Sequence, residues 1–283
     1  MITLVRRATA LCLLGAALAA CGTDQAPEAP RPAPSAPSAA PSKAAPPPTL
    51  APGPAGLTPV FEHGPRARGK TVALTFDADM TADQGPRAAA GERFDNPRLI
   101  EALRELKVPA TVFMTGRWAE EYPDAARSLG RDPRFEIANH SYSHYAYTDD
   151  CYGLPSVSRE RMRADVERAY TAFRKAGVAN AMPYFRFPGG CYDRAALEEL
   201  TATGVTAVQW DVVSGDAFAT DADAVARQVL DGVRPGSVVV LHCTRSAAPV
   251  TERAVRTIVP ELRSRGYRFV KVSELIGAGN GRA

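Results

Sequence analysis

The sequence is poor in histidine, in cysteine and in net charge. It has four His and five Cys among 283 residues, and its formal net charge is only +3. So small a charge provides no strongly basic surface, so we expect no nucleic-acid partner. Five scattered cysteines exclude a small disulfide-framework fold. With so few histidines, their positions become informative.

Long hydrophobic runs are also missing. The apolar stretch from Ala8 to Ala20 is too short to span a bilayer comfortably, and Arg6 and Arg7 precede it. Residues 1–20 therefore have the pattern of a secretory signal peptide. The run LAACG also resembles the lipobox of bacterial lipoproteins, which makes Cys21 the expected lipidated first residue of the mature chain. An ordinary secretory signal and an uncut membrane helix are the alternatives.

Residues 21–62 have few large apolar side chains and are rich in Ala and Pro. A segment of this composition cannot bury enough surface to offset its ordering entropy, and Pro-rich linkers are extended spacers. We therefore predict a disordered tether at residues 21–62 and a folded domain at residues 63–283. The protein is expected outside the cytoplasm, anchored to the cell membrane by lipid. A plain disordered tail is the alternative reading of the tether.

The folded part alternates between apolar strands and helices about seven times. Strands are predicted at residues 71–76, 110–114, 135–138, 184–187, 205–210, 237–241 and 267–272, with helices between them at 99–106, 120–129, 158–175, 194–203, 221–232 and 250–264. Such alternation predicts parallel strands joined by helical crossovers. Polar residues gather at the carboxyl ends of several strands, where α/β proteins place their sites. A site supplied by several strands favours a distorted (β/α) barrel of about seven strands over an open sheet.

Two pairs of residues are candidate metal ligands. His140 and His144 stand four apart in NHSYSH, and on a helical turn they share one face and can hold one metal ion. A solvated polar turn is the alternative. Asp77 and Asp79 in TFDADM point the same way if the strand continues. Two such carboxylates need a cation or protons to balance them, unless they are solvated loop acids or a helix N-cap.

Arg186 lies inside the apolar run FRFPGG. A buried Arg is rarely left unpaired, and Asp77 is a candidate partner. The Pro–Gly turn that follows can expose backbone N–H groups to an oxyanion. A structural Arg–acid pair under a loop is the alternative.

A histidine and two acids complete the candidates. His242 ends the hydrophobic run VVVLHC and can serve as a general acid, or it can be structural. The segment WDVVSGD supplies the aromatic ring of Trp210 and the acids Asp211 and Asp216. One of the two acids is expected to orient His242.

Taken together, these motifs have a familiar order. The chain from about Thr71 to Ile276 resembles the polysaccharide deacetylase family, carbohydrate esterase family four, whose members share a distorted (β/α) barrel and five ordered motifs. TFDAD stands in the place of TFDDG, HSYSH matches H[ST]xxH, and RFPGG resembles RxPY. The fourth motif corresponds to Trp210 with Asp216. The fifth motif, LxH, corresponds to the run VLH, which ends in His242.

The resemblance implies a role for each matched residue. It implies that Asp77 is the general base, that Arg186 sets the pKa of Asp77, and that His140 and His144 are metal ligands. It implies that His242 is the general acid and is oriented by Asp216. Trp210 and Val240 would form the walls of the acetyl pocket, and the backbone near Gly189 would be the oxyanion donor. The expected cofactor is a divalent metal, with Zn²⁺ suiting two imidazoles and a carboxylate.

The sequence departs from the family pattern at two positions. The family's metal-binding Asp directly follows the base, and here that place is Ala78. Either Asp79 replaces it, or only the two His remain, or Asp77 itself binds the metal; same-side projection favours Asp79. The family's Tyr in the third motif is Gly189. Cys151, Cys191 and Cys243 each follow a motif, so one disulfide is expected, of undetermined pairing.

The expected function is therefore hydrolytic N-deacetylation of an N-acetylglucosamine-containing polysaccharide, such as peptidoglycan or a chitin-like glycan, by a monomer. An O-acetyl esterase acting on xylan is one alternative, because both reactions pass through a tetrahedral oxyanion. A catalytically weak glycan-binding lipoprotein, which has lost its metal through Ala78, is the other.

Overall fold

The computed structural model describes residues 46–280. The predicted signal peptide, Cys21 and most of the predicted tether lie outside these residues. Residues 46–62, which we assigned to the tether, are among the described residues. The early segment packs on the domain: the hydroxyl of Tyr184 donates to the carbonyl of Pro48 at 2.7 Å. No helix within residues 46–280 is long and apolar enough to cross a membrane.

The strands form one parallel sheet that curls into a half-barrel. They are β1 (Val60–Phe61), β2 (Thr71–Ala78), β3 (Ala110–Met114), β4 (Phe135–Asn139), β5 (Tyr184–Phe185), β6 (Thr206–Val208), β7 (Val212–Val213), β8 (Ser237–His242) and β9 (Arg268–Phe269). Their order is β1-β6-β5-β4-β3-β2-β8-β7, and β9 pairs with the start of β2. Each predicted strand is present, which confirms the barrel-like α/β fold. The short β1 and β7 were not predicted.

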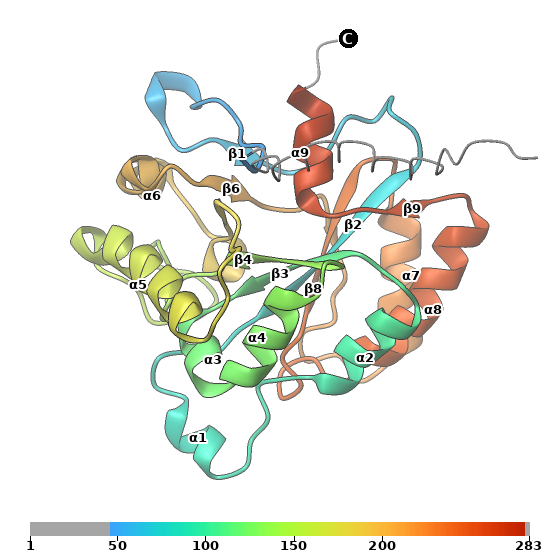
Figure 1. Cartoon of the computed structure of the whole chain (residues 1–283), viewed down its shortest axis with the longest axis horizontal. Helices are drawn as coiled ribbons and strands as arrows, with labels where there is room; N and C mark the ends of the chain where they lie inside the picture. Colours follow the sequence, from blue (N-terminus) through green and yellow to red (C-terminus); the bar gives the residue numbers. More distant parts are fainter. Residues whose placement is uncertain (1–45, 281–283) are drawn as a thin grey trace, which may run out of the picture. The chain divides into compact units, whose positions relative to one another are not determined.

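Helices surround the curled sheet (Figure 1). They are α1 (Gly85–Ala89), α2 (Pro97–Glu105), α3 (Gly116–Glu121), α4 (Pro123–Arg131), α5 (Met162–Lys175), α6 (Arg194–Leu200), α7 (Ala222–Gly232), α8 (Thr251–Ser264) and α9 (Val272–Asn280), with short 3₁₀ turns at Pro54–Gly56, Arg159–Arg161, Pro188–Gly190 and Thr201–Thr203. In Figure 1, α2, α7 and α8 lie together on one side, and α3, α4 and α5 on the other.

The single helix predicted at residues 120–129 is instead two helices. The chain leaves helical geometry at Tyr122, with φ −122° and ψ 59°, and α4 begins at Pro123. The proline ring disfavours helical geometry at the residue before it and supplies no N–H, so it opens a new helix. The prediction was wrong because helical spacing continues across this break.

Side chains alternate along β2, so one face of the strand packs into the core and the other face carries Asp77. The even-numbered residues from Val72 to Ala78 belong to the core between sheet and helices. Ala73 belongs to a second cluster with Leu275 and Ile276 of α9. Since side chains alternate along a strand, Asp77 lies on the same face as Ala73, opposite to the face of Ala78. Ala78 is therefore a core residue.

Candidate active site

Strand register brings the predicted site residues to one edge of the sheet. Asp77 of β2 lies opposite His242 of β8, and Asn139 of β4 lies opposite Phe185 of β5. His140 and Arg186 directly follow the second pair. In a parallel sheet the carboxyl ends of all strands meet at one edge, which is where this fold type places its sites.

Asp77 and Arg186 form a buried ion pair. Arg186 Nη1 donates to Asp77 Oδ1 at 2.7 Å, and none of the Arg186 side chain is exposed. The guanidinium also donates to the carbonyl of Val208 and stacks 3.9 Å from the ring of Phe113. Burial alone raises the pKa of Asp77, but the charges of Arg186, His140 and His242 outweigh it and hold the pKa below its ordinary value. Asp77 is therefore a carboxylate at neutral pH.

His140 and His144 lie together, with ring centroids 5.0 Å apart. The helical turn we predicted for them is wrong, because Ser141 and His144 have left-handed backbone with φ 68° and 56°. Side-chain hydrogen bonds hold this bend. The Ser141 N–H donates to Asn139 Oδ1, and the His144 N–H donates to Ser141 Oγ. Such local bonds compete with a helix, so the same pair of histidines converges by another route.

The side chains around this bend have donors suited to a divalent cation. His140 Nδ1 lies 2.9 Å from the carbonyl of Arg186, which can only accept, so Nε2 is the nitrogen left for a metal. Burial lowers the pKa of His144 to about 4, so its ring is neutral at pH 7. His144 Nε2 lies 4.0 Å from Asp79 Oδ2, and His140 Nε2 lies 3.7 Å from Asp77 Oδ2.

These separations are compatible with shared coordination. Two atoms bound to one zinc ion lie within about 4.2 Å of each other, which is twice the usual bond length. Within residues 46–280, however, no group of three or more His, Cys, Asp or Glu side chains is placed so that it could hold a metal ion. The distances therefore allow an ion within either pair, without a formed three-ligand site.

His242 and Asp216 form the second charged pair of the site. His242 Nδ1 lies 2.7 Å from Asp216 Oδ1, and the His242 N–H donates to Asp216 Oδ2. Burial alone lowers the pKa of His242, but the hydrogen bond and charge of Asp216 outweigh it and raise the pKa to about 10. His242 is therefore protonated at neutral pH and can donate a proton. Ser214 and Thr251 donate to the same carboxylate.

Asp79 is held by a residue that the sequence analysis missed. Thr244 Oγ1 donates to Asp79 Oδ1 at 2.9 Å and accepts the Asp79 N–H at 3.1 Å. Thr244 follows His242 by two residues, but its role depends on a long-range contact with no local signal. A groove of about 220 Å³ opens over these groups and is lined by Asp79, Met80, Thr81, Gln84, Arg87, Glu92, Phe94, His144, Leu154, Phe218, Thr244, Ser246 and Ala247.

The third motif is shaped by a disulfide. Cys151 and Cys191 are bonded, and Cys243 is a free, buried thiol. Gly189 has φ 66°, and a Cβ placed on it would lie 2.6 Å from Cys151 Sγ. The bridge thus occupies the space that a side chain at this position would need.

The remaining predicted wall residues flank these groups. Trp210 lies against Gly190, where an added Cβ would be 2.5 Å from the indole, and its ring lies 5.3 Å from the guanidinium of Arg186. Val240 is buried and pairs with Thr75, two residues before Asp77.

Asp211 does not join the site. Its carboxylate accepts from the Val238 N–H at 2.7 Å and from Ser237 Oγ at 2.8 Å, and it pairs with Arg66. These contacts lie at the start of β8, away from His242 at its end. Of the two acids in WDVVSGD, only Asp216 orients His242, because β7 carries the chain from one end of β8 to the other.

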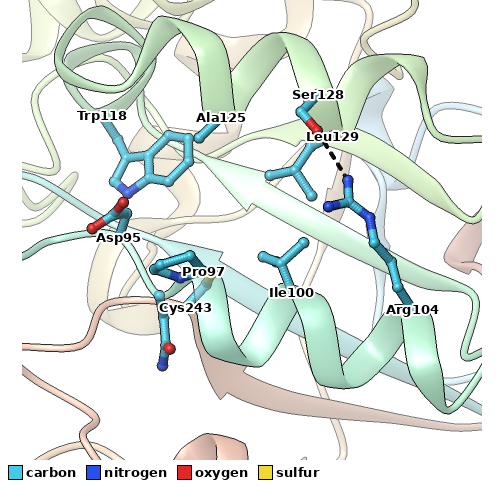
Figure 2. Close-up of a pocket in the computed structure, with 10 residues that line it drawn as sticks. Asp95, Pro97, Ile100, Arg104, Trp118, Ala125, Ser128, Leu129 and Cys243 are labelled. Carbon is cyan, nitrogen blue, oxygen red and sulfur yellow. Dashed lines mark hydrogen bonds between the residues drawn. The ribbon is translucent and has the colours of Figure 1, made fainter.

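A second cavity lies between α2 and α4. Its volume is about 190 Å³, and it is lined by Asp95, Asn96, Pro97, Ile100, Arg104, Trp118, Ala125, Ser128, Leu129 and Cys243. Figure 2 shows Arg104 donating to Ser128 beside Ile100 and Leu129. Asp95 is already paired with Arg93. Because its lining is mainly apolar and its charged groups are paired, we favour the groove beside Asp79 and His144 as the candidate site, although Asp77 and His242 do not themselves line it.

Comparisons with known proteins bear on the family of this chain. The family model described as "Polysaccharide deacetylase" matches residues 64–208. A chitooligosaccharide deacetylase of Azorhizobium caulinodans is 28% identical over 66% of this chain and 89% of its own length. A peptidoglycan-N-acetylglucosamine deacetylase of Bacillus cereus is 29% identical over 72% of this chain and 67% of its own length.

Solved structures show the same fold. A peptidoglycan N-acetylglucosamine deacetylase has a TM-score of 0.66 at 25% identity, covering 80% of this chain and 96% of its own. An acetyl xylan esterase of Clostridium thermocellum, solved with a cobalt ion, has a TM-score of 0.57 at 25% identity, covering 74% and 91%. The match of the family model over half of the sequence, together with the site geometry, shows that this chain belongs to the polysaccharide deacetylase family.

Proposed function

We propose that this protein is a metal-dependent N-deacetylase of polysaccharides that contain N-acetylglucosamine. The observation that carries the proposal is the pairing of Asp77 with His242 across β2 and β8. Each has a partner that holds it in the charge state a hydrolase needs: Arg186 keeps Asp77 ionised, and Asp216 keeps His242 protonated. A base and an acid with separated pKa values are the expected pair for amide hydrolysis.

In the proposed reaction, Asp77 accepts a proton from the attacking water. The water oxygen bonds to the acetyl carbon, and the carbon–nitrogen bond of the amide breaks. His242 donates its Nε2 proton to the departing nitrogen, because its Nδ1 is held by Asp216. The products are acetate and a free amine on the sugar. The backbone beside Gly189 is the proposed oxyanion donor, and Trp210 with Val240 bounds the methyl group.

The proposed metal ligands are His140, His144 and Asp79. A divalent ion such as Zn²⁺ would polarise the carbonyl and acidify the water when bound. Asp79 is the favoured third ligand, because Asp79 Oδ2 lies 4.0 Å from His144 Nε2. Ala78 has no donor atom, and its side chain belongs to the core. If Asp79 does not bind the ion, the catalytically weak glycan-binding protein becomes the better reading of the chain.

Metal content tests the ligand assignment. We expect about one zinc per full-length chain after dialysis against zinc, and a clearly lower content in Asp79→Ala. Thr81→Ala, at a neighbouring position that lines the same groove without a carboxylate, is the matched control and should keep the zinc. Absence of zinc from the unaltered protein would overturn the metal-dependent mechanism.

Acetate release tests the substrate class. We expect release from N-acetylglucosamine oligomers and from peptidoglycan, and little from acetylated xylan. Asp77→Asn should lower the turnover rate by roughly 10²–10⁴-fold, because it removes a positioned base while preserving its shape. Release from xylan alone would instead establish the O-acetyl esterase.

The proposal extends to the cell location. The lipobox at Cys21 and the Pro-rich segment after it support an extracytoplasmic enzyme held at the membrane by lipid, within reach of cell-wall glycan.

A further inference from the structure

Two aromatic side chains near the groove are largely exposed to solvent. Tyr152 is 88% exposed and Phe218 is 83% exposed, whereas most other aromatic rings of residues 46–280 are buried or half-buried. Neither ring contributes to the core. Burial of an aromatic side chain is strongly favourable, so a surface ring retained beside a site indicates contact with another molecule.

Both residues also have unfavourable backbone. Their φ values are 51° and 60°, and a left-handed conformation costs a non-glycine residue about 1–2 kcal/mol. Six non-glycine residues among those described have positive φ, and two of the others are Ser141 and His144 of the histidine bend. Strain is therefore concentrated around the site, where it persists because the surrounding structure fixes the geometry.

The fold holds both residues in place. The Phe218 N–H donates to the carbonyl of Ala247 at 2.6 Å, and Phe218 lines the groove together with Asp79 and His144. Tyr152 directly follows Cys151, whose disulfide ties it to the third motif. Its ring edge lies beside Gly189, 3.4 Å from where a Cβ on that residue would be.

The groove itself is small. Its volume of about 220 Å³ is below the roughly 300–1,000 Å³ of pockets that enclose a drug-sized ligand. A polymer that places one acetylated sugar in this groove must lay its other sugars on the surrounding surface. Pyranose rings present faces of C–H groups, and the electron-rich face of an aromatic ring attracts such groups.

We infer that Phe218 and Tyr152 are stacking platforms for sugar rings of a glycan chain that extends beyond the reacting unit. This inference rests on the proposed glycan deacetylase function and deepens it, because it makes the enzyme selective for chains over single sugars. The disulfide positions one platform, and the loop between Asp216 and Ala219 positions the other.

The test compares chain-length dependence in Phe218→Ala, Tyr152→Ala and the double variant. For each single variant we expect kcat/KM on a hexamer of N-acetylglucosamine to fall about five- to tenfold, mainly through KM. Hydrolysis of 4-nitrophenyl acetate, which has no sugar chain, should fall less than hexamer hydrolysis in every variant. Phe218→Trp and Tyr152→Phe should keep the preference for long chains, while Phe218→Leu, which has no ring face, should lose it.

A stability measurement separates this role from a structural one. Phe218→Gly removes the ring and relieves the left-handed strain, so we expect an equal or higher Tm together with weaker hexamer use. A lower Tm for Phe218→Gly would contradict the inference, as would unchanged chain-length dependence in the double variant.

Binding distinguishes failure of the inference from failure of the proposed function. In an Asp77→Asn background, calorimetry with the hexamer should show a Kd weakened by tenfold or more when both rings are removed. If hexamer binding depends on the two rings but the unaltered protein releases no acetate, the proposed deacetylase function is rejected and the role of the rings in glycan binding stands. Acetate release with ring-independent binding would reject the platforms alone.

Discussion

Arg186 is the most deeply buried charge of the site, and its only carboxylate partner among the described residues is Asp77. Removing one member of a buried ion pair leaves the other charge uncompensated. We therefore expect Arg186→Met to lower the free energy of unfolding by about 3–5 kcal/mol in urea denaturation. The same change should raise the pKa of Asp77 and weaken it as a carboxylate at neutral pH.

Arg227 provides a matched control. It pairs with Asp221 at 3.8 Å, but both side chains are largely exposed. Exposed pairs are screened by water, so Arg227→Met should cost less than about 1 kcal/mol. Equal losses in the two variants would show that burial of the Asp77–Arg186 pair does not govern its energetics.

Asp216 should set the alkaline limit of activity. His242 acts as an acid only while protonated, and Asp216 raises its pKa to about 10. In Asp216→Asn the charge is lost, and burial favours the neutral ring. The pKa of His242 should therefore fall, so activity at pH 8 should drop roughly tenfold or more, and much less at pH 5.5. An unshifted pH profile would exclude His242 as the general acid.

The same pair makes stability depend on pH. Below pH 6.5 His242 is charged in the folded and the unfolded chain, so its pairing contributes fully. Between pH 6.5 and about 10 only the folded chain keeps the proton, and the contribution falls as pH rises through this window. Between pH 6 and pH 10, the free energy of unfolding should therefore fall more for the unaltered protein than for Asp216→Asn, as measured by denaturation at the two pH values.

The residues proposed to carry the chemistry could be predicted from the sequence, but the residues that hold them in place could not. His140, His144 and His242 could be singled out because histidines are so few, and Asp77 because it ends an apolar strand. Thr244 carries no local signal, since its contact with Asp79 joins residues 165 apart in the sequence. Their assigned roles as ligands, acid and base stay predictions until the variants are measured.

At the level of elements, the strands with strong apolar runs were predicted well. Strands β1 and β7 were missed because they are two residues long and exist through pairing with β6 and β8. The pairing of Cys151 with Cys191 could not be chosen from sequence either. It depends on how the loop after the histidine bend folds back on the third motif.

This disulfide should stabilise the domain by closing a loop. The two cysteines are 40 residues apart, and loops of this length gain roughly 2–4 kcal/mol from a bridge. We expect the double variant Cys151→Ser, Cys191→Ser to lose this amount in denaturant titrations. Reductant should reproduce the loss in the unaltered protein and leave the double variant unaffected.

At the scale of the whole molecule, the proposed anchor decides where the enzyme works. Cys21→Ser should prevent lipidation and move the protein from the membrane fraction to the soluble fraction of fractionated cells. Acetate release by the purified protein should stay unchanged, because all the candidate catalytic residues lie within residues 46–280. Membrane association that survives the substitution would indicate an uncut membrane helix.

The disulfide beside Gly189 also constrains the history of the sequence. Any side chain at this position would collide with Cys151 Sγ, so the tyrosine typical of the family and this bridge exclude each other. We therefore expect relatives that carry both cysteines to have glycine at this position, and relatives with the family's tyrosine to lack the bridge.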